Sequence, residues 1–273
     1  MNKIKQCALV SVIIPCYNNS RTLLRAFNSI LKQELLPAEI IFINDASSDK
    51  TSDLLSKLKR QYIGFVKVLS LKNNQGVATA RNTGWAIATQ PYIAFLDADD
   101  AWHPKKLEIQ YTYMLANPDV LLSGHNHKII KKITELPLWD IGSWKVRTLS
   151  KWELILSNQF ITPSVMLKRS ILLHFDSGMR HMEDHRLWTD IVACGGKAVK
   201  LEIPLASTYK YSFGQSGLSS QLWKMEKSDL ANVSHFFDAG YVNRLQCFLL
   251  KLYSLIKFAR RLLIISFLLR WVK

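Results

Sequence analysis

Cysteine is scarce in this sequence, and the few cysteines lie far apart. The chain of 273 residues has four, without a Cys-x-x-Cys pair and without clustered histidine partners: Cys7, Cys16, Cys194 and Cys247. This spacing argues against a cysteine-ligated zinc site and against the disulfide framework of a small secreted protein. We therefore expect four free thiols in a reducing compartment.

A long hydrophobic run is also missing. The longest uncharged run in the C-terminal segment, residues 262–269, has eight residues, whereas a helix needs about 20 to cross a bilayer. Lys3 and Lys5 precede an apolar stretch, as in a signal peptide, but Pro15 before Cys16 is not a small-residue cleavage site. We interpret this stretch as a first strand and, with no export signal, expect the catalytic part to stay in the cytoplasm.

Acidic residues are few, with 21 Asp and Glu against 36 Lys and Arg, a net charge of +15. Residues 241–273 contain seven cations and no acid, and they are rich in Leu, Ile and Phe. A cationic apolar helix of this kind is typical of segments that lie on an anionic membrane, with Trp271 at the headgroups. We therefore expect residues 245–273 to hold the protein peripherally on the cytoplasmic face of the inner membrane. The alternative is a helix docked on the domain's own core or on a second subunit.

Nucleic acid is not an expected partner, because the cations alternate with bulky aliphatic residues and no nucleic-acid-binding motif is present. The hydrophobic fraction of 48% indicates a globular protein, and the sequence has neither repeats nor low-complexity segments. The oligomeric state is left open.

Short apolar runs alternate with amphipathic stretches through the first 110 residues. This order predicts an α/β domain with a mostly parallel, Rossmann-like sheet and helices on both faces. Leu36-Pro37 is expected to end the first helix. Each strand is followed by polar residues, which places those residues at one edge of the sheet. The four expected strands are residues 9–14, 40–43, 65–69 and 91–96.

Three carboxylates, Asp97, Asp99 and Asp100, directly follow the fourth expected strand. Carboxylate oxygens at the carboxyl end of a buried strand suit Mg²⁺ or Mn²⁺, which in turn holds a diphosphate. The alternative is a solvated acidic turn before a helix, with Asp100 near the N-cap.

Four blocks of sequence, in this order and spacing, resemble family 2 glycosyltransferases of the type that builds bacterial lipopolysaccharide and exopolysaccharide. They are residues 12–19 (VIIPCYNN), 43–51 (INDASSDKT), 74–82 (NQGVATARN) and 95–102 (FLDADDAW). The resemblance is strong over residues 8–115 and looser to about residue 215. It implies a GT-A fold over residues 1–220, with a nucleotide-sugar half (1–115) and an acceptor half (116–220), followed by a basic amphipathic helical tail (221–273). It also implies a sugar-nucleotide donor and Mn²⁺ or Mg²⁺ as cofactor.

The resemblance assigns the donor side residue by residue. Pro15 and Tyr17 would lie under the nucleoside, and Asp45 would accept a hydrogen bond from the base, which favours uracil. Asp97 would hold the ribose and Asp99 the metal. The family more often has Asp-Asp-Gly-Ser around the position of Asp45, where this chain has residues 44–47 as Asn-Asp-Ala-Ser.

Three further residues are carried over to the donor side with alternatives. Arg81 would face phosphate or base, unless it is a surface arginine. Asp100 would support the metal ligand or cap a helix. Lys210 would contact the phosphates from a loop over residues 210–219 that orders over the donor, unless this loop is a plain linker.

The acceptor side rests on residues 178–188, which resemble the family's Glu-Asp-x-x-Leu-Trp motif. Asp184 would be the general base, and Glu183 would raise its pKa or orient the acceptor. The structural alternative is that acids favour the first turn of a helix. His125 and His127 are expected at a polar strand edge, with contact to a ligand as the alternative, and Ser150 is expected to begin a helix with a capping box.

Together these assignments predict a metal-dependent inverting hexosyltransferase. Its donor would be a nucleoside-diphosphate sugar, with UDP favoured, and its acceptor a hydroxyl of a lipid-linked or cell-surface glycan. Two other classes stay open, a non-catalytic partner protein with the same fold and a metal-dependent nucleotidyltransferase. The sequence leaves the sugar, the acceptor and the linkage position open.

Overall fold

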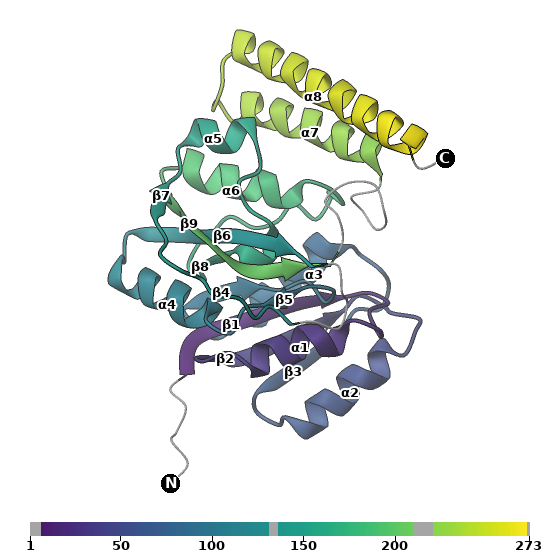
Figure 1. Ribbon diagram of the computed structural model, residues 1–273, viewed down its shortest axis with the longest axis vertical. Helices are drawn as coiled ribbons and strands as arrows, with labels where there is room; N and C mark the ends of the chain where they lie inside the picture. Colours follow the sequence, from purple (N-terminus) through teal and green to yellow (C-terminus); the bar gives the residue numbers. More distant parts are fainter. Residues whose placement is uncertain (1–6, 131–135, 210–220, 272–273) are drawn as a thin grey trace.

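The computed structural model describes residues 7–130, 136–209 and 221–271. Within these residues nine strands form one sheet of order β3-β2-β1-β4-β8-β6-β9-β5, with β7 paired to β9 (Figure 1). The strands are β1 (Cys7–Cys16), β2 (Leu36–Asn44), β3 (Val66–Ser70), β4 (Tyr92–Phe95), β5 (Ala101–Trp102), β6 (Val120–Ile129), β7 (Val146–Thr148), β8 (Met166–Lys168) and β9 (Lys197–Thr208). The helices are α1 (Leu23–Leu31), α2 (Thr51–Gln61), α3 (Val77–Ile87), α4 (Lys106–Ala116), α5 (Lys151–Leu156), α6 (Glu183–Ala193), α7 (Leu222–Asp238) and α8 (Arg244–Trp271), with a 3₁₀ turn at Thr162–Ser164.

The first four strands are parallel neighbours, as the alternation of elements predicts. The predicted end of the first helix at Leu36-Pro37 is wrong, because α1 ends at Leu31 and both residues begin β2. Pro37 lies before Ile40, where the pairing of β2 with β3 begins. Pro37 has no N–H to donate, but at this position it removes no hydrogen bond from the pairing of β2 with β3.

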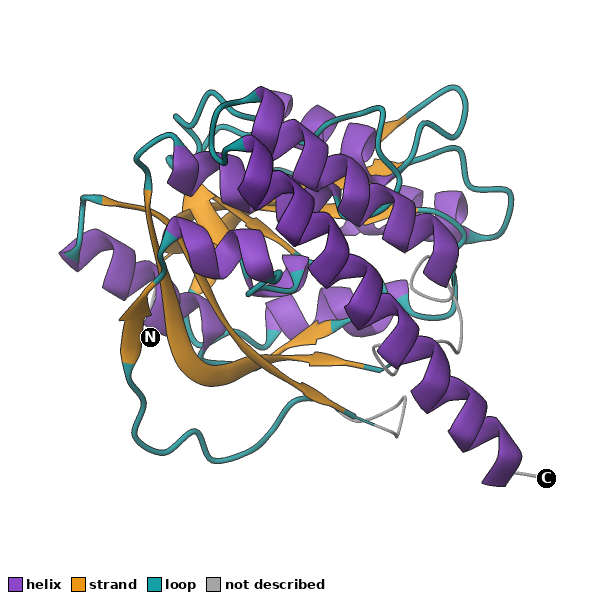
Figure 2. Ribbon diagram, turned by 90° about the horizontal axis from the view of Figure 1, so that it is seen from above, coloured by secondary structure: helices purple, strands orange, loops and turns teal. Residues whose placement is uncertain are grey.

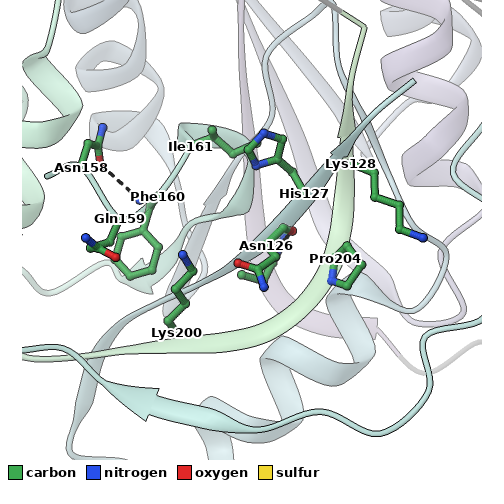
Figure 3. Close-up of a pocket in the computed structure, with 10 residues that line it drawn as sticks. Asn126, His127, Lys128, Asn158, Gln159, Phe160, Ile161, Lys200 and Pro204 are labelled. Atoms are coloured by element: carbon green, nitrogen blue, oxygen red, sulfur yellow. Dashed lines mark hydrogen bonds between the residues drawn. The ribbon is translucent and has the colours of Figure 1, made fainter. Parts of the chain in front are cut away.

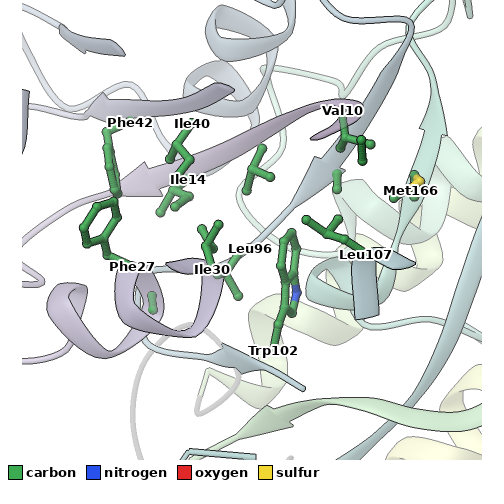
Figure 4. Close-up of a cluster of buried hydrophobic side chains, with 14 of the residues drawn as sticks. Val10, Ile14, Phe27, Ile30, Ile40, Phe42, Leu96, Trp102, Leu107 and Met166 are labelled. Carbon is green, nitrogen blue, oxygen red and sulfur yellow. The ribbon is translucent and has the colours of Figure 1, made fainter. Parts of the chain in front are cut away.

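Helices cover both faces of the sheet, as predicted. Alternate residues of β1 point to opposite faces, so Val12 and Ile14 pack in one hydrophobic cluster and Ile13 packs in another. The first cluster also holds side chains of α1, α2 and α4 (Figure 4). The second holds side chains of α3, α5 and α6. Strands buried on both faces explain the continuous apolar runs of the sequence.

The second half of the sheet is mixed. β8 is antiparallel to both β4 and β6, whereas β6 and β9 are parallel to each other. β8 has three residues and β5 has two, too few to show a period in the sequence. The second half also brings the start of α6 to the edge of the sheet where the polar loops follow the parallel strands, since Arg180, just before α6, donates to Asn74 of the loop after β3 at 3.2 Å.

The two C-terminal helices form a hairpin beside α5 and α6 (Figure 1). Cys247 and Leu250 of α8 pack with Val233 and Phe236 of α7 and with Ile155 of α5. In Figure 2 the C-terminal part of α8 extends beyond the body of the molecule. Over the described residues, no helix has the length and apolar character needed to span a membrane. None of the four cysteines forms a disulfide, as expected.

Polar contacts fix this hairpin. The hydroxyl oxygen of Ser254 lies 2.8 Å from Oε1 of Glu226 and 2.6 Å from Oδ2 of Asp229, so its single hydrogen is within reach of both acids. Lys257 pairs with Asp229 at 3.8 Å, and Arg261 pairs with Glu226 at 3.6 Å. The alternative of a docked helix is therefore correct for one face of α8. The sequence of α8 showed no sign of this docking, because the acids that pair with α8 lie on α7.

Candidate active site

A single arginine joins three segments at the carboxyl edge of the sheet. Arg81 of α3 donates from Nη1 to Oε1 of Glu183 at 2.8 Å and from Nη2 to Oδ1 of Asp97 at 2.9 Å. Its side chain is 4% exposed, and its guanidinium carbon lies 5.3 Å from the centre of the Phe175 ring. The surface-arginine alternative is wrong, since Arg81 links the turn after β4 to the first turn of α6.

The charges of this cluster perturb one another. Burial alone would lower the pKa of Arg81, but the carboxylates of Asp97 and Glu183 raise it above its usual value. Burial raises the pKa of both carboxyl groups against the effect of Arg81, and Asp184 raises them further. One cation thus holds several acids together, as in sites that perform proton transfer.

The turn at Asp97 does not lead into a helix. The N–H of Asp100 bonds the carbonyl of Asp97 at 3.0 Å, and β5 follows directly. α4 begins only at Lys106. The prediction that Asp100 caps a helix is therefore wrong.

Arg25 of α1 also reaches this turn, which the sequence analysis missed. It donates from Nη2 to the carbonyl of Asp99 and stacks over the ring of Tyr209 at 3.6 Å. The charges of Asp99 and Asp100 act on its pKa, although burial is the larger effect and lowers it. An arginine within an amphipathic helix carries no local sign of such a contact. Arg25 is thus a second cation beside the carboxylates.

Asp45 holds the loop that precedes α3. Its Oδ1 accepts the N–H of Gln75 at 2.7 Å and its Oδ2 accepts the N–H of Gly76 at 2.9 Å. Gly76 has φ of +93°, a conformation that glycine adopts without strain. Asp45 therefore links the loop after β2 to the loop after β3.

Ala46 occupies the position at which the family more often has glycine, and its φ is +56°. An L-residue in this left-handed conformation loses roughly 1–2 kcal/mol, partly offset by the entropy that alanine removes from the unfolded chain. We expect Ala46→Gly to raise the free energy of unfolding by up to about 1 kcal/mol. Urea unfolding measures this change in the free energy of unfolding. The control is Ala239→Gly, at a helix C-cap with negative φ, which should not be stabilised.

The other predicted donor residues are placed as follows. Pro15 is buried near the end of β1, opposite Ile43 of β2. Tyr17 follows β1 and is 50% exposed, so its ring is accessible to a ligand. Lys210 and the predicted loop over residues 210–219 lie outside the described residues.

Asp184 lies in the first turn of α6, next to Glu183. Its Oδ2 accepts hydrogen bonds from Nδ2 of Asn158 and Oγ1 of Thr162, both at 3.2 Å. Its Oδ1 accepts the N–H of His185 at 2.7 Å. Asn158 and Thr162 were missed, because Asn158 lies in the irregular stretch after α5 and Thr162 begins a 3₁₀ turn of only three residues. The predicted capping box of Ser150 at the start of α5 is confirmed.

A cavity of about 500 Å³ adjoins Asp184 through Asn158 (Figure 3). The described residues that line it come from β6, β9 and the loop after α5: His125, Asn126, His127, Lys128, Asn158, Gln159, Phe160, Ile161, Lys200 and Pro204. His125 is 1% exposed, because β6 lies between β8 and β9. The prediction that it lies at a polar edge is wrong.

Within the described part of the chain, no three His, Cys, Asp or Glu side chains form a group that could hold a metal ion. Mg²⁺ is often bound by one or two carboxylates, with substrate phosphates and water as the remaining ligands. Asp99 and Asp100 lie in one tight turn, which the N–H of Asp100 closes on the carbonyl of Asp97 at 3.0 Å, so the turn can offer hard carboxylate oxygens to a cation. This donor set fits a cation that is shared with a diphosphate.

Comparison with known proteins identifies this arrangement. Residues 11–180 match Glycosyl transferase family 2. The chain belongs to this family. It is 32% identical over 218 residues to the UDP-Glc:alpha-D-GlcNAc-diphosphoundecaprenol beta-1,3-glucosyltransferase WfgD of Escherichia coli, covering 79% of this chain and 81% of the relative. It is also 32% identical to an uncharacterized glycosyltransferase of Haemophilus influenzae, covering 90% of this chain and 96% of that one.

The fold of this glycosyltransferase matches solved structures. S. aureus TarS 1-349 in complex with UDP-GlcNAc superposes with a TM-score of 0.68 and 16% sequence identity, covering 90% of this chain and 71% of that one. The predicted GT-A fold is therefore confirmed. At this identity the likeness concerns the fold alone.

Proposed function

We propose that this glycosyltransferase moves a sugar from a UDP-sugar to a hydroxyl of a lipid-linked or cell-surface glycan, with inversion at the anomeric carbon. The observation that carries the proposal is the link from Asp97 through Arg81 to Glu183, which brings the turn after β4 beside Asp184. The name of the relative WfgD supports both a UDP-sugar donor and a lipid-linked acceptor.

Different residues at the carboxyl edge of the sheet would contact different parts of the donor. The exposed ring of Tyr17 lies beside the nucleoside, above Pro15. Asp45 keeps the loop at Gly76 in place, and each of its oxygens retains a lone pair for an N–H of uracil. Arg81 pairs with Oδ1 of Asp97, and we assign Oδ2 of Asp97 to the ribose.

Asp99 is the proposed ligand of Mn²⁺ or Mg²⁺, with Asp100 behind it in the same turn. When bound, such a cation supplies the charge that neutralises the leaving diphosphate. The half-buried Arg25 donates to the carbonyl of Asp99 in this turn.

Asp184 is the proposed general base. Asn158 and Thr162 orient its Oδ2, and the salt bridge to Arg81 holds the neighbouring Glu183 away from the acceptor. Asp184 takes the proton of the acceptor hydroxyl as that oxygen attacks the anomeric carbon. The bond from this carbon to the diphosphate breaks on the opposite face, so UDP leaves and the configuration is inverted.

Replacing Asp99 with alanine should separate metal-assisted from metal-free binding of UDP. We expect UDP with Mn²⁺ to bind at least about tenfold more weakly to Asp99→Ala, because the ion would lose its protein ligand. Affinity in EDTA should be unchanged. Thermal shift titrations with UDP measure the affinity with Mn²⁺ and the affinity in EDTA. Asp53→Ala, at an exposed position of α2, is the control. Equal Mn²⁺ dependence in variant and control would refute the assignment of Asp99.

The helix α8 has one face that is docked on the protein and one that is exposed, and the exposed face supports membrane association. Cys247, Leu250, Ser254, Lys257 and Arg261 recur every three or four residues and face α7 and α5. A second stripe at the same spacing is apolar and exposed: Leu245, Phe248, Leu249, Leu252, Ile256 and Leu263. We propose that this stripe enters the interface of the cytoplasmic membrane while the neighbouring cations attract anionic lipids.

Changing Leu245, Phe248 and Ile256 to glutamine should weaken binding to vesicles that contain anionic lipid by more than about tenfold, since each loses about 1.5 kcal/mol or more of burial. The melting temperature should stay within a few degrees, because these side chains are more than half exposed. Co-sedimentation provides the measurement. Glutamine at Ile63, Leu138 and Leu172, which are exposed elsewhere, is the matched control. Equal sedimentation of both triple variants would show that α8 is not the membrane contact.

A further inference from the structure

The cavity beside Asp184 has a lining suited to an anion. Its described lining includes Lys128 and Lys200, the histidines His125 and His127, three amide side chains and no carboxylate. Figure 3 shows that the lining comes from neighbouring segments of the chain, and Asn126 and Lys200 lie on the paired strands β6 and β9. Cations are costly to bury unless opposite charge compensates them, and the carboxylate that acts on Lys200, Glu202, is not among the lining residues.

The pKa shifts of two lining residues also indicate a site for an anion. Burial lowers the pKa of Lys200, and the nearby Arg147 lowers it further against the opposing effect of Glu202. Burial and then the charge of Lys200 lower the pKa of His127. These shifts show a surplus of positive charge in a half-buried space, which an anionic ligand would relieve.

One polar atom of the lining is buried without a partner. The Nδ1 of His125 is 2.8 Å from the carbonyl of Asn126, so Nδ1 carries the proton and Nε2 presents a lone pair. Nε2 is buried, and within the described residues it has no hydrogen-bond partner. After burial, the charge that acts most strongly on the pKa of His125 is that of Lys106, whose Nζ is also buried without a hydrogen-bond partner among the described residues. The cavity itself combines cations for phosphate with amides for a sugar.

The position of the cavity connects it to the proposed chemistry and to the membrane. Asn158 lines it and donates to Oδ2 of Asp184. Lys257 of α8 donates to the carbonyl of Leu156 at 3.2 Å, two residues before Asn158. The segment after α5 that lines the cavity therefore contacts both the proposed base and the helix proposed to contact lipid.

We propose that this cavity binds the phosphate through which the acceptor sugar is joined to its lipid carrier, with Lys200 and His127 as the phosphate contacts; the ammonium group of Lys128 lies over the Trp139 ring at 4.7 Å instead. The sugar next to that phosphate then places its hydroxyl at Asp184. The proposal rests on the proposed function and deepens it, because it makes an anionic link to the carrier a requirement of the acceptor. A volume of about 500 Å³ lies within the range of small-molecule sites.

The test uses decyl diphosphate, inorganic pyrophosphate and decyl glucoside as probes of the full-length protein. All titrations contain EDTA, so that no metal-bridged site takes up diphosphate. The variant Lys200→Gln/His127→Gln removes the main contacts, and Lys59→Gln on exposed α2 is the control for charge. Calorimetry gives the affinities, and the ring signals of His127 in NMR spectra report binding in the cavity of the unaltered protein.

We expect decyl diphosphate to bind wild type and Lys59→Gln equally, to shift the His127 signals, and to bind the double variant at least tenfold more weakly. Decyl glucoside should bind far more weakly than decyl diphosphate. Equal affinities for pyrophosphate and decyl diphosphate would show that the protein binds the phosphates alone. A lower affinity for pyrophosphate would show that the lipid chain also contributes to binding. Both results support the proposal. Unchanged affinity in the double variant, or His127 signals that do not move, would overturn it.

A parallel UDP titration with Mn²⁺ separates this proposal from the proposed function. UDP binding with no diphosphate binding in the cavity would refute the acceptor site alone. Absence of UDP binding would instead refute the donor assignment. If the double variant unfolds, the NMR titration of the wild type still decides the question.

Discussion

Asp184→Asn is expected to reduce sugar transfer by about 10²–10⁴-fold while the protein remains folded. The amide keeps the shape of the side chain and can still accept from Asn158 and Thr162, but it cannot take a proton. The kcat for transfer should fall, and the Kd for UDP should stay the same, because Asp184 is assigned to the acceptor. We expect a loss of about 1–2 kcal/mol in the free energy of unfolding, since the N–H of His185 then faces an amide N–H.

The control for Asp184→Asn is Asp190→Asn on the same helix. Asp190 bonds His235 at 2.9 Å, away from the acceptor side, so its substitution should lower stability and leave kcat nearly unchanged. A variant Asp184→Asn that retains kcat would remove Asp184 from the mechanism. A parallel loss of kcat in Asp190→Asn would point to a general effect of α6 on activity.

Arg81→Met should have the largest effect on stability, lowering the free energy of unfolding by about 3–5 kcal/mol. Methionine fills much of the volume of the arginine stem, but it leaves the buried Glu183 and the partly buried Asp97 without the cation that they share. The proposed donor and acceptor sites would also lose the link between them, so we expect activity to be lost. Urea unfolding measures the stability, and circular dichroism shows whether the variant is folded.

A triple variant tests the physical reason. In Arg81→Met/Asp97→Asn/Glu183→Gln both acids become neutral, so most of the lost stability should return, while activity should not. If the triple variant is as unstable as Arg81→Met, the packing of Arg81 against Phe175, and not its charge, stabilises the fold. Arg81→Lys should be intermediate, because an ammonium cannot pair with both acids in the same geometry.

The donor side could be predicted from the sequence because its features are local. Each strand passes directly into the polar loop that carries Tyr17, Asp45 or Asp97, so the alternation of elements is enough to bring these loops to one edge. The same holds for Glu183 and Asp184, which are adjacent in the chain.

Contacts between distant segments could not be predicted. Arg25 meets the Asp99 turn only because α1 crosses that end of the sheet, and Asn158 reaches Asp184 from a loop without a periodic pattern. The burial of His125 depends on two strands that pair with β6 from later in the chain. Likewise, α8 has no acid of its own, and the acids that hold it lie on α7. Side-chain type alone did not reveal any of these partners.

The most direct test of the proposed function is proton and phosphorus NMR of a reaction that contains the protein, Mn²⁺, a series of UDP-sugars and a diphosphate-linked acceptor sugar. We predict that one α-linked UDP-sugar is consumed, that UDP appears in equal amount, and that the anomeric proton of the product has the coupling of a β-glycoside. Release of pyrophosphate would indicate nucleotidyl transfer. An α-linked product would contradict the single displacement assisted by Asp184.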